Sequence, residues 1–426
     1  MTRSPLRRGS LATAVSLVLG LGAAACSSSS DAVDQTSVDP GASKEEYATA
    51  LADMDPVELK LQVLTPKGSA NAQATDAYAA AVEELSDGKI TFKLHYSGSI
   101  AATDAEQAVS DGLIDIAPIH PSMHPDTFPV QAYASNFAFM SDNSPIVGSL
   151  QGISAWLEAG FDEQIMDEMR SNGLEPLLPM TIPSSNLMFC GEDPVRSLAD
   201  AKKTTARVAT AGNSQEVKAI GASTVNLPTL EIFEGMQRGT VDCVVTGWAV
   251  PVAFGLGEVS KSWMVDPTVQ FTGSSETLAV GKDTWDALPL AARQLMWDEL
   301  DVYLKSYIDN NLVATLHAAM TQAQEQDVTF YEYDEDLKQA LTDLHEQDSA
   351  EAGKNSPDGF DGKAFADSTR QAHESWKKTI IDLGYDDSVG WEQFRTGKDK
   401  GTDVDVQPLV DELTEKVLGE HRPTAQ

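Results

Sequence analysis

Hydrophobic and polar residues alternate in two runs near the start of the chain, and a stretch with helical spacing separates them. Alternation at 59–64 and at 90–96 predicts two strands, and apolar positions three and four residues apart predict a helix over 71–85. A short helix over 103–110 and a third strand over 114–119 follow. This β-α-β-α-β order with short connections predicts a parallel sheet, whose ligands lie beyond the carboxyl ends of the strands.

A second series of the same kind begins near residue 186. Its predicted strands are 186–190, 205–209, 223–227 and 240–245, and its predicted helices are 213–220 and 230–237. The later elements are expected, in order, as a strand at 277–280, a helical region over 283–326, a strand at 328–333, and helices at 334–345, 362–383 and 406–418. We therefore predict an α/β protein with two lobes of parallel sheets, arranged as a clamshell, with a long hinge-side helix and an enlarged helical C-terminus.

These patterns divide the chain into six segments. We expect a signal peptide at 1–25, a lipid anchor and flexible tether at 26–56, a first lobe at 57–185, a second lobe at 186–275, a return to the first lobe with the long helix at 276–346, and a helical C-terminal extension at 347–426.

The first 30 residues have the layout of an export signal. Three arginines among the first eight residues precede an uncharged, mostly apolar run at 11–25, which is shorter than the roughly 20 residues of a membrane-spanning helix. Cys26 follows three alanines, as in lipoprotein signals, where this cysteine is acylated. The alternative is an ordinary signal peptide cleaved near Ala25. The arginines at 7 and 8 leave both general secretion and twin-arginine export open. We expect an exported protein, lipid-anchored through Cys26 on the outer face of the cell membrane.

The charge balance narrows the choice of partners. Thirty Lys and Arg residues against 65 Asp and Glu residues give the 426-residue chain a formal net charge of −35. This charge argues against nucleic acid, whose phosphates require a basic face, and against a polybasic grip on anionic lipid. A small anionic ligand is still compatible with it, because salt screens distant charges over about 8 Å. Three cysteines are too few for a disulfide scaffold or a four-cysteine zinc site.

Motifs of catalysis are lacking from the sequence, which has no Gly-x-Ser-x-Gly, His-Glu-x-x-His or phosphate loop. His120 and His124 have the spacing of a helical metal pair. However, Pro121 and Pro125 make a loop the better prediction, and a third ligand is not evident. We expect no cofactor, no metal and no enzymatic activity.

Three stretches of sequence together resemble one family. The stretch 98–115 ends in Gly-Leu-Ile-Asp, 193–242 runs from Asp-Pro-Val to Met-Gln-Arg-Gly-Thr-Val-Asp, and 282–289 reads Lys-Asp-Thr-Trp-Asp-Ala-Leu-Pro. In this order they resemble the solute receptors of TRAP transporters, of the dicarboxylate-receptor (DctP) type, over roughly 57–345. The resemblance implies a periplasmic-binding-protein-like fold whose cleft closes on an organic acid. It also implies delivery of that acid to separate small and large TRAP membrane subunits.

The resemblance singles out Arg207, which occupies the position of the family's carboxylate-binding arginine. A planar guanidinium makes two parallel hydrogen bonds to a carboxylate and keeps its charge when desolvated. The alternative is that Arg207 caps a strand or pairs with a structural aspartate.

Other positions depart from the family's pocket. Thr229 replaces a frequent phenylalanine, Thr246 replaces a frequent asparagine, and the uncharged run that begins at Asn186 replaces a strand that often carries a second arginine. One arginine without these groups predicts a monocarboxylate, or a larger and more apolar acid. Trp248 is a candidate for a replacement stacking surface, and packing beneath the lobe is its alternative.

The first lobe supplies further candidate ligand-binding residues from its loops at 65–71 and 120–123. These are Asn71 and Ser122, with Lys67 and Asp104 as additional candidates. The family also places the strands of Cys190 and Cys243 near each other, which implies a disulfide in the exported compartment. Two buried free thiols are the alternative.

We therefore predict a receptor that binds an organic carboxylate and delivers it to TRAP membrane subunits. A cell-envelope lipoprotein that keeps the fold but acts as a lipid-handling or protein-interaction partner is the alternative, because pocket groups are lost and the C-terminus is enlarged. A hydrolase is the third hypothesis.

Overall fold

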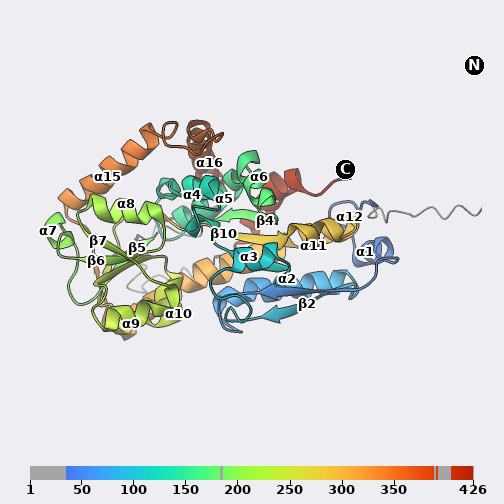
Figure 1. Cartoon of the computed structure of the whole chain (residues 1–426), viewed down its shortest axis with the longest axis horizontal. Coiled ribbons are helices and arrows are strands. Elements are labelled where there is room, and N and C mark those ends of the chain that lie inside the picture. The colour runs from blue at the N-terminus through green and yellow to red at the C-terminus, as the bar shows by residue number, and fades with distance from the viewer. Residues whose placement is uncertain (1–34, 183–185, 388–389, 392–403, 426) are drawn as a thin grey trace, which may run out of the picture. The chain divides into compact units, whose positions relative to one another are not determined.

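The chain folds into two β-sheets surrounded by helices (Figure 1). The structure is a computed structural model that describes residues 35–182, 186–387, 390–391 and 404–425. The signal peptide, Cys26 and residues 26–34 of the predicted tether lie outside the described residues. The helices are α1 (Lys44–Ala50), α2 (Ala70–Leu85), α3 (Ala105–Ser110), α4 (Pro129–Ser135), α5 (Val147–Gly160), α6 (Glu163–Ser171), α7 (Leu198–Ala201), α8 (Ala211–Ala219), α9 (Ile232–Gln237), α10 (Ala249–Phe254), α11 (Lys282–Ala287), α12 (Leu290–Asp298), α13 (Leu300–Tyr307), α14 (Thr315–Glu325), α15 (Glu335–Ala350), α16 (Gly362–Asp382) and α18 (Gln407–Leu413).

The first sheet has the strand order β2-β1-β3-β10-β4. Its strands are β1 (Val57–Gln62), β2 (Ile90–His95), β3 (Ile116–Ile119), β4 (Leu174–Thr181) and β10 (Glu276–Gly281). The second sheet has the order β11-β9-β5-β8-β6-β7. Its strands are β5 (Leu187–Cys190), β6 (Thr205–Val208), β7 (Ser223–Asn226), β8 (Cys243–Thr246), β9 (Ser262–Met264) and β11 (Thr329–Tyr331).

Both sheets are mixed, which corrects the prediction of parallel sheets. β1 is parallel to β2 and β3, whereas β10 is antiparallel to β3 and β4. In the second sheet, β6 is parallel to β7 and β8, whereas β5 is antiparallel to β8 and β9. The chain reaches β5 and β10 from the other sheet and not through a crossover helix from a neighbouring strand, so these two strands are not bound to the parallel direction.

The chain returns to the second sheet earlier than predicted. β11 pairs in parallel with β9 at Phe330 and Trp263. The return to the first lobe that we expected over 276–346 therefore ends before residue 329. Between β10 and β11, the helical region predicted over 283–326 is divided into α11 to α14, with a π-helical turn over 308–314.

The predicted flexible tether is ordered and packed in its second half. α1 begins with a capping box, in which the Ser43 and Glu46 side chains bond each other's backbone N–H. Tyr47 is buried, and its hydroxyl donates to Asp298 Oδ2 at 2.5 Å. Leu51 at the end of the helix is also buried. Apolar burial therefore fixes a segment whose Ser- and Asp-rich beginning suggests disorder.

The C-terminal helices α16 and α18 pack against other helices of the protein. α16 lies along α5, and α18 contacts α13. The Asp387 carboxylate accepts hydrogen bonds from the first N–H groups of α5, at Ile146 and Val147. Among the described residues, no helix has both the length and the hydropathy needed to cross a membrane.

Candidate functional site

Arg207 lies in the interior of the second sheet, on β6 between β7 and β8. Its register partners are Val225 and Val244, and both valines belong to or border the cluster that α9 forms with this face of the sheet. Only 4% of the Arg207 surface is exposed. The small and β-branched neighbours make β6 a buried strand, so its register forces the arginine into an apolar layer.

The guanidinium of Arg207 has neutral partners. Nε donates to the Leu227 carbonyl at 3.0 Å, and Nη2 donates to Thr229 Oγ1 at 3.3 Å. Among the described residues, no carboxylate lies within the 4.0 Å of an ion pair with it. Burial lowers the pKa of Arg207 to about 10, so the side chain is still charged at neutral pH. A buried charge without a counterion is costly, and an anionic ligand would compensate it.

Thr229, Thr246 and Asn186 lie at the same edge of the second sheet as Arg207. Thr246 ends β8 and shares the face of Arg207, because it follows Val244 by two residues. Asn186 precedes the antiparallel β5, so the amino end of β5 meets the carboxyl ends of β6 and β8. The sheet thus gathers one charged and three neutral polar residues.

Asn186 is not free to bind a ligand with its amide nitrogen. Its Nδ2 donates to Asn213 Oδ1 at 3.1 Å and to the Thr272 carbonyl at 2.9 Å. The residue is buried and forms a bridge with Phe271. Asn186 therefore connects the amino end of β5 to Asn213 and to the Thr272 carbonyl.

Trp248 packs inside the protein, which is the alternative to a stacking surface that the sequence left open. Its ring contacts Phe189, Trp263 and Trp391, with ring centroids 5.6 to 5.9 Å apart. Only 4% of Trp248 is exposed. The aromatic cluster accounts for the burial of the tryptophan by packing, and the role of a stacking surface for a ligand stays a prediction.

The first-sheet candidates lie at the carboxyl edge of that sheet. Ser122 follows β3 in the turn Pro121–Met123, is buried, and has no hydrogen-bond partner for its hydroxyl among the described residues. Asn71 lies in α2, and its side chain is outside the described atoms. Lys67 places its ammonium group 5.7 Å from the ring centre of Tyr96. Asp104 accepts a hydrogen bond from Thr103.

Sequence reasoning missed an acid at this edge. Glu276 begins β10, and one of its carboxylate oxygens lies 3.9 Å from His120 Nε2. Desolvation raises the pKa of Glu276. A second histidine also lies near a carboxylate, with His124 Nε2 3.6 Å from Glu106 Oε2. No sequence signal marks Glu276, because the antiparallel pairing of β10 with β3 is what brings it to His120.

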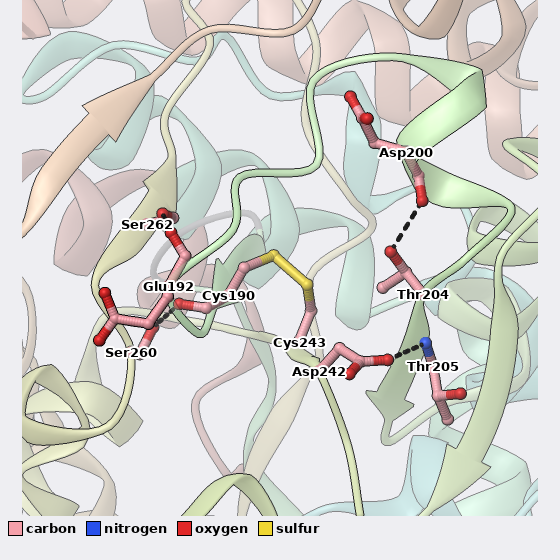
Figure 2. The surroundings of a disulfide bond; sticks show 9 residues. All are labelled: Cys190, Glu192, Asp200, Thr204, Thr205, Asp242, Cys243, Ser260 and Ser262. Carbon is pink, nitrogen blue, oxygen red and sulfur yellow. Dashed lines mark hydrogen bonds between the residues drawn. A yellow bond between two sulfur atoms is a disulfide. The ribbon is translucent and has the colours of Figure 1, made fainter. Parts of the chain in front are cut away.

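The second sheet carries a disulfide (Figure 2). Cys190 and Cys243 face each other directly across the β5–β8 pair, and their sulfur atoms are bonded. Both residues are buried, and Cys243 is also the register partner of Ala206. The neighbouring Asp242 accepts a hydrogen bond from the Thr205 N–H at 2.7 Å. The disulfide therefore joins β5 to β8, the strand that lies next to the arginine's own strand β6.

A groove of about 810 Å³ lies elsewhere, between the loops 139–144 and 267–270 and the helix α15. Arg207 is not among its lining residues. Its charged lining has both signs, with Asp142, Glu346 and Arg370, and two of these are paired with neighbouring side chains, Asp142 with Lys377 and Arg370 with Asp367. The chemistry of Arg207 therefore identifies the candidate site better than the size of this groove does.

Comparisons with known proteins agree with this architecture. The family model of the bacterial extracellular solute-binding proteins, family 7 (DctP), matches residues 62–354. A solute-binding protein of Albidiferax ferrireducens is 26% identical over 220 residues, which are 51% of this chain and 62% of the relative. The alignment thus spans less than two thirds of that relative's length.

Two solved structures are similar in fold. A TRAP solute-binding protein of Rhodoferax ferrireducens with copurified benzoate has a TM-score of 0.65 and 19% identity, and covers 76% of this chain and 99% of its own. A marine metagenome TRAP solute-binding protein from an unidentified microbe is specific for aromatic acids and was co-crystallised with 3-hydroxybenzoate. It has a TM-score of 0.64 and 17% identity, with the same two coverages.

The two sheets and their helices thus have the two-lobe, periplasmic-binding-protein-like fold, as predicted. The chain belongs to family 7 of the bacterial extracellular solute-binding proteins, the DctP family. This family consists of substrate-binding receptors and not of enzymes.

Proposed function

We propose that this protein binds an organic carboxylate between its two sheets and delivers it to TRAP-type small and large membrane subunits. The observation that carries the proposal is the buried guanidinium of Arg207, which has two neutral hydrogen-bond partners and no carboxylate within ion-pair distance among the described residues. A ligand carboxylate would supply the missing negative charge, with charge-assisted bonds of about 1.5–3 kcal/mol each.

The ligand class that we propose is a monocarboxylate with an apolar body. Thr229 and Thr246 add no second positive charge at the edge that Arg207 occupies. Leu230, directly after Thr229, is 71% exposed, and Leu64 and Ile100 are exposed after β1 and β2. Apolar side chains at the carboxyl ends of strands favour an apolar ligand. The benzoate and 3-hydroxybenzoate bound by structural relatives support this class.

We further propose that the protein is held on the outer face of the cell membrane by a lipid on Cys26. The basic start, the short apolar run and the three alanines before the cysteine support this proposal. Metabolic labelling with a radioactive or clickable fatty acid tests it. Incorporation in the full chain and its loss in Cys26→Ser are expected, whereas labelling of neither protein would refute it.

A panel of acids tests the ligand class directly. Thermal unfolding of residues 35–426 would be followed with aliphatic, aromatic and sugar acids and with long-chain fatty acids. A ligand at 100 times its Kd adds about 2.7 kcal/mol to the unfolding free energy. We expect an aromatic or other apolar monocarboxylate to stabilise the protein. Stabilisation by a long-chain fatty acid alone would favour the lipid-handling role instead.

Two variants make the panel specific. Arg207→Gln is expected to abolish the stabilisation. Arg196→Gln is the matched control, because Arg196 belongs to the same lobe but is half exposed and paired with Asp334 at 2.8 Å. Equal stabilisation of wild type and Arg207→Gln would contradict the proposed role of Arg207.

A further inference from the structure

Helix α15, the segment that follows it and helix α16 connect the hydrophobic clusters of the two sheets. We call these residues, 335–382, the C-terminal brace. At one end, Leu337 and Leu341 of α15 are buried in the hydrophobic cluster of the second sheet. At the other end, Phe360 and Phe365 are buried with Met180 of β4, in the first sheet. The match to the family ends at residue 354, so the second half of the brace lies beyond the matched region.

The brace runs as an orange-to-brown arm from α15 to α16 (Figure 1). Between its two ends, the second half of α15 lines the groove of about 810 Å³ together with the loops 139–144 and 267–270. At the α15 end of the brace, Lys338 lies 3.0 Å from the fully buried Asp266 in the segment between β9 and β10.

His345, in α15 of the brace, contacts residues that lie near each of the two sheets. Its Nε2 lies 2.9 Å from Glu216 Oε1, on α8 beside the second sheet. Its ring stacks on Phe139, with centroids 4.1 Å apart and planes 4° apart. Phe139 packs against the cluster that includes Met180 of the first sheet. One imidazole thus contacts a residue of α8, beside the second sheet, and a residue packed against the cluster that includes Met180 of the first sheet.

Glu216 continues this contact to the edge of the candidate site. Its Oε1 accepts hydrogen bonds from the Thr272 N–H at 2.8 Å and hydroxyl at 2.6 Å. Its Oε2 accepts from Asn213 Nδ2 at 3.1 Å, and Asn213 Oδ1 accepts from Asn186 Nδ2 at 3.1 Å. Except for His345, every member of this network is at most 4% exposed. A buried and fully paired network holds its members in fixed positions.

We infer that the C-terminal brace restrains the motion of the two sheets relative to each other, and that His345 is a positioning residue for the edge that carries Arg207. His345 is connected through Glu216 and Asn213 to Asn186. Through Phe139 it is connected to the hydrophobic cluster that includes Met180 of the first sheet. The inference does not depend on which ligand the protein binds, because it concerns contacts within the chain.

The restraint is tested by distance measurements between spin labels in residues 35–426. Leu113→Cys, near the first sheet, and Arg238→Cys, after α9, provide labelling sites that are 58% exposed and largely exposed, respectively. Double electron–electron resonance should give a narrow distance distribution for the otherwise unchanged protein. His345→Ala should broaden that distribution and add a population at longer distance. An unchanged distribution would overturn the brace.

Hydrogen exchange measures the positioning role separately. In His345→Ala, the peptides that cover 186–190 and 211–216 should exchange faster, because Glu216 loses one of its partners. Unchanged exchange there would overturn the positioning role of His345. His345→Gln, which can still donate to Glu216, should restore most of the protection.

His421 provides the matched control. It also stacks on a phenylalanine, Phe161, with centroids 4.1 Å apart and planes 6° apart, but neither ring belongs to the brace or to the hydrogen-bond network of Glu216. His421→Ala should leave the label distances and the two peptides unchanged. If it changes them as much as His345→Ala does, the effect is a general loss of stability and the inference fails. Phe139→Leu tests the stacking contact alone if His345→Ala does not fold.

Discussion

Replacing Arg207 by methionine is expected to stabilise the ligand-free protein while it abolishes carboxylate binding. The perturbation removes a buried charge and keeps a long, unbranched side chain that can fill the same space. Most buried residues behave in the opposite way, because their truncation or replacement destabilises the fold. The sign of the change therefore distinguishes a ligand-binding arginine from a structural one.

The magnitude follows from the burial of the side chain. Burial lowers the pKa of Arg207 from the ordinary 12.5 to about 10. At about 1.36 kcal/mol for each pH unit, the charged form costs roughly 3 kcal/mol relative to water. The replacement also loses the hydrogen bonds to the Leu227 carbonyl and to Thr229. Both partners are partly exposed to water, so this loss is about 1 kcal/mol in all. A net stabilisation of about 2 kcal/mol is expected.

Urea denaturation of the ligand-free wild type and Arg207→Met measures this difference. Bound ligand must first be removed by partial unfolding and dialysis, because it would stabilise the wild type alone. Arg196→Met, at a half-exposed position, should change the unfolding free energy by less than about 0.5 kcal/mol. If Arg207→Met is less stable than the wild type by 1 kcal/mol or more, Arg207 is a structural residue and the reasoning is refuted.

Three other perturbations test separate parts of the fold. Burial and neighbouring acids raise the pKa of Glu299 to about 7, so its contribution to stability is present at pH 4.5 and is lost as the pH rises through 7. The unfolding free energy from urea denaturation should therefore be about 1–3 kcal/mol higher at pH 5 than at pH 8 through this residue, and Glu299→Gln should remove that difference. An unchanged pH profile in Glu299→Gln would contradict this prediction. Replacing both Cys190 and Cys243 by serine opens a loop of 53 residues and should cost about 4 kcal/mol of unfolding free energy, whereas a loss below 1 kcal/mol, or two free thiols found by mass spectrometry in the exported protein, would argue against the disulfide. Tyr47→Phe should lower the unfolding free energy by about 1 kcal/mol through the lost bond to Asp298, and no change would mean that α1 does not pack as described.

The hydrophobic pattern predicted those elements that bury one face. β1 and β2 have the period-two alternation of half-buried strands, and both lie within a few residues of the predicted ranges. β4 escaped prediction because all eight of its residues are buried, so its pattern does not alternate, and two prolines interrupt it. α5 escaped for the same reason, since nearly all of its faces are covered. Strand direction was also inaccessible, because antiparallel and parallel central strands have similar hydrophobic patterns.

The candidate site was predictable only in part. Arg207 was identified because the family's motif surrounds it, and the structure adds that its partners are neutral. Trp248 illustrates a limit: a tryptophan in sequence does not reveal whether its ring faces a pocket or three other aromatic rings. The contact between His345 and Glu216 joins residues 129 positions apart, and no local signal marks it.

The most direct test of the account is a calorimetric titration of the ligand-free protein with the most stabilising acid of the panel and with its uncharged amide. The acid should bind to the wild type, the amide should bind at least about 100-fold more weakly, since each lost charge-assisted bond is worth about 1.5–3 kcal/mol, and neither should bind to Arg207→Gln. Equal affinities for the acid and the amide, or unchanged binding of the acid by Arg207→Gln, would contradict the claim that Arg207 binds the carboxylate of the ligand.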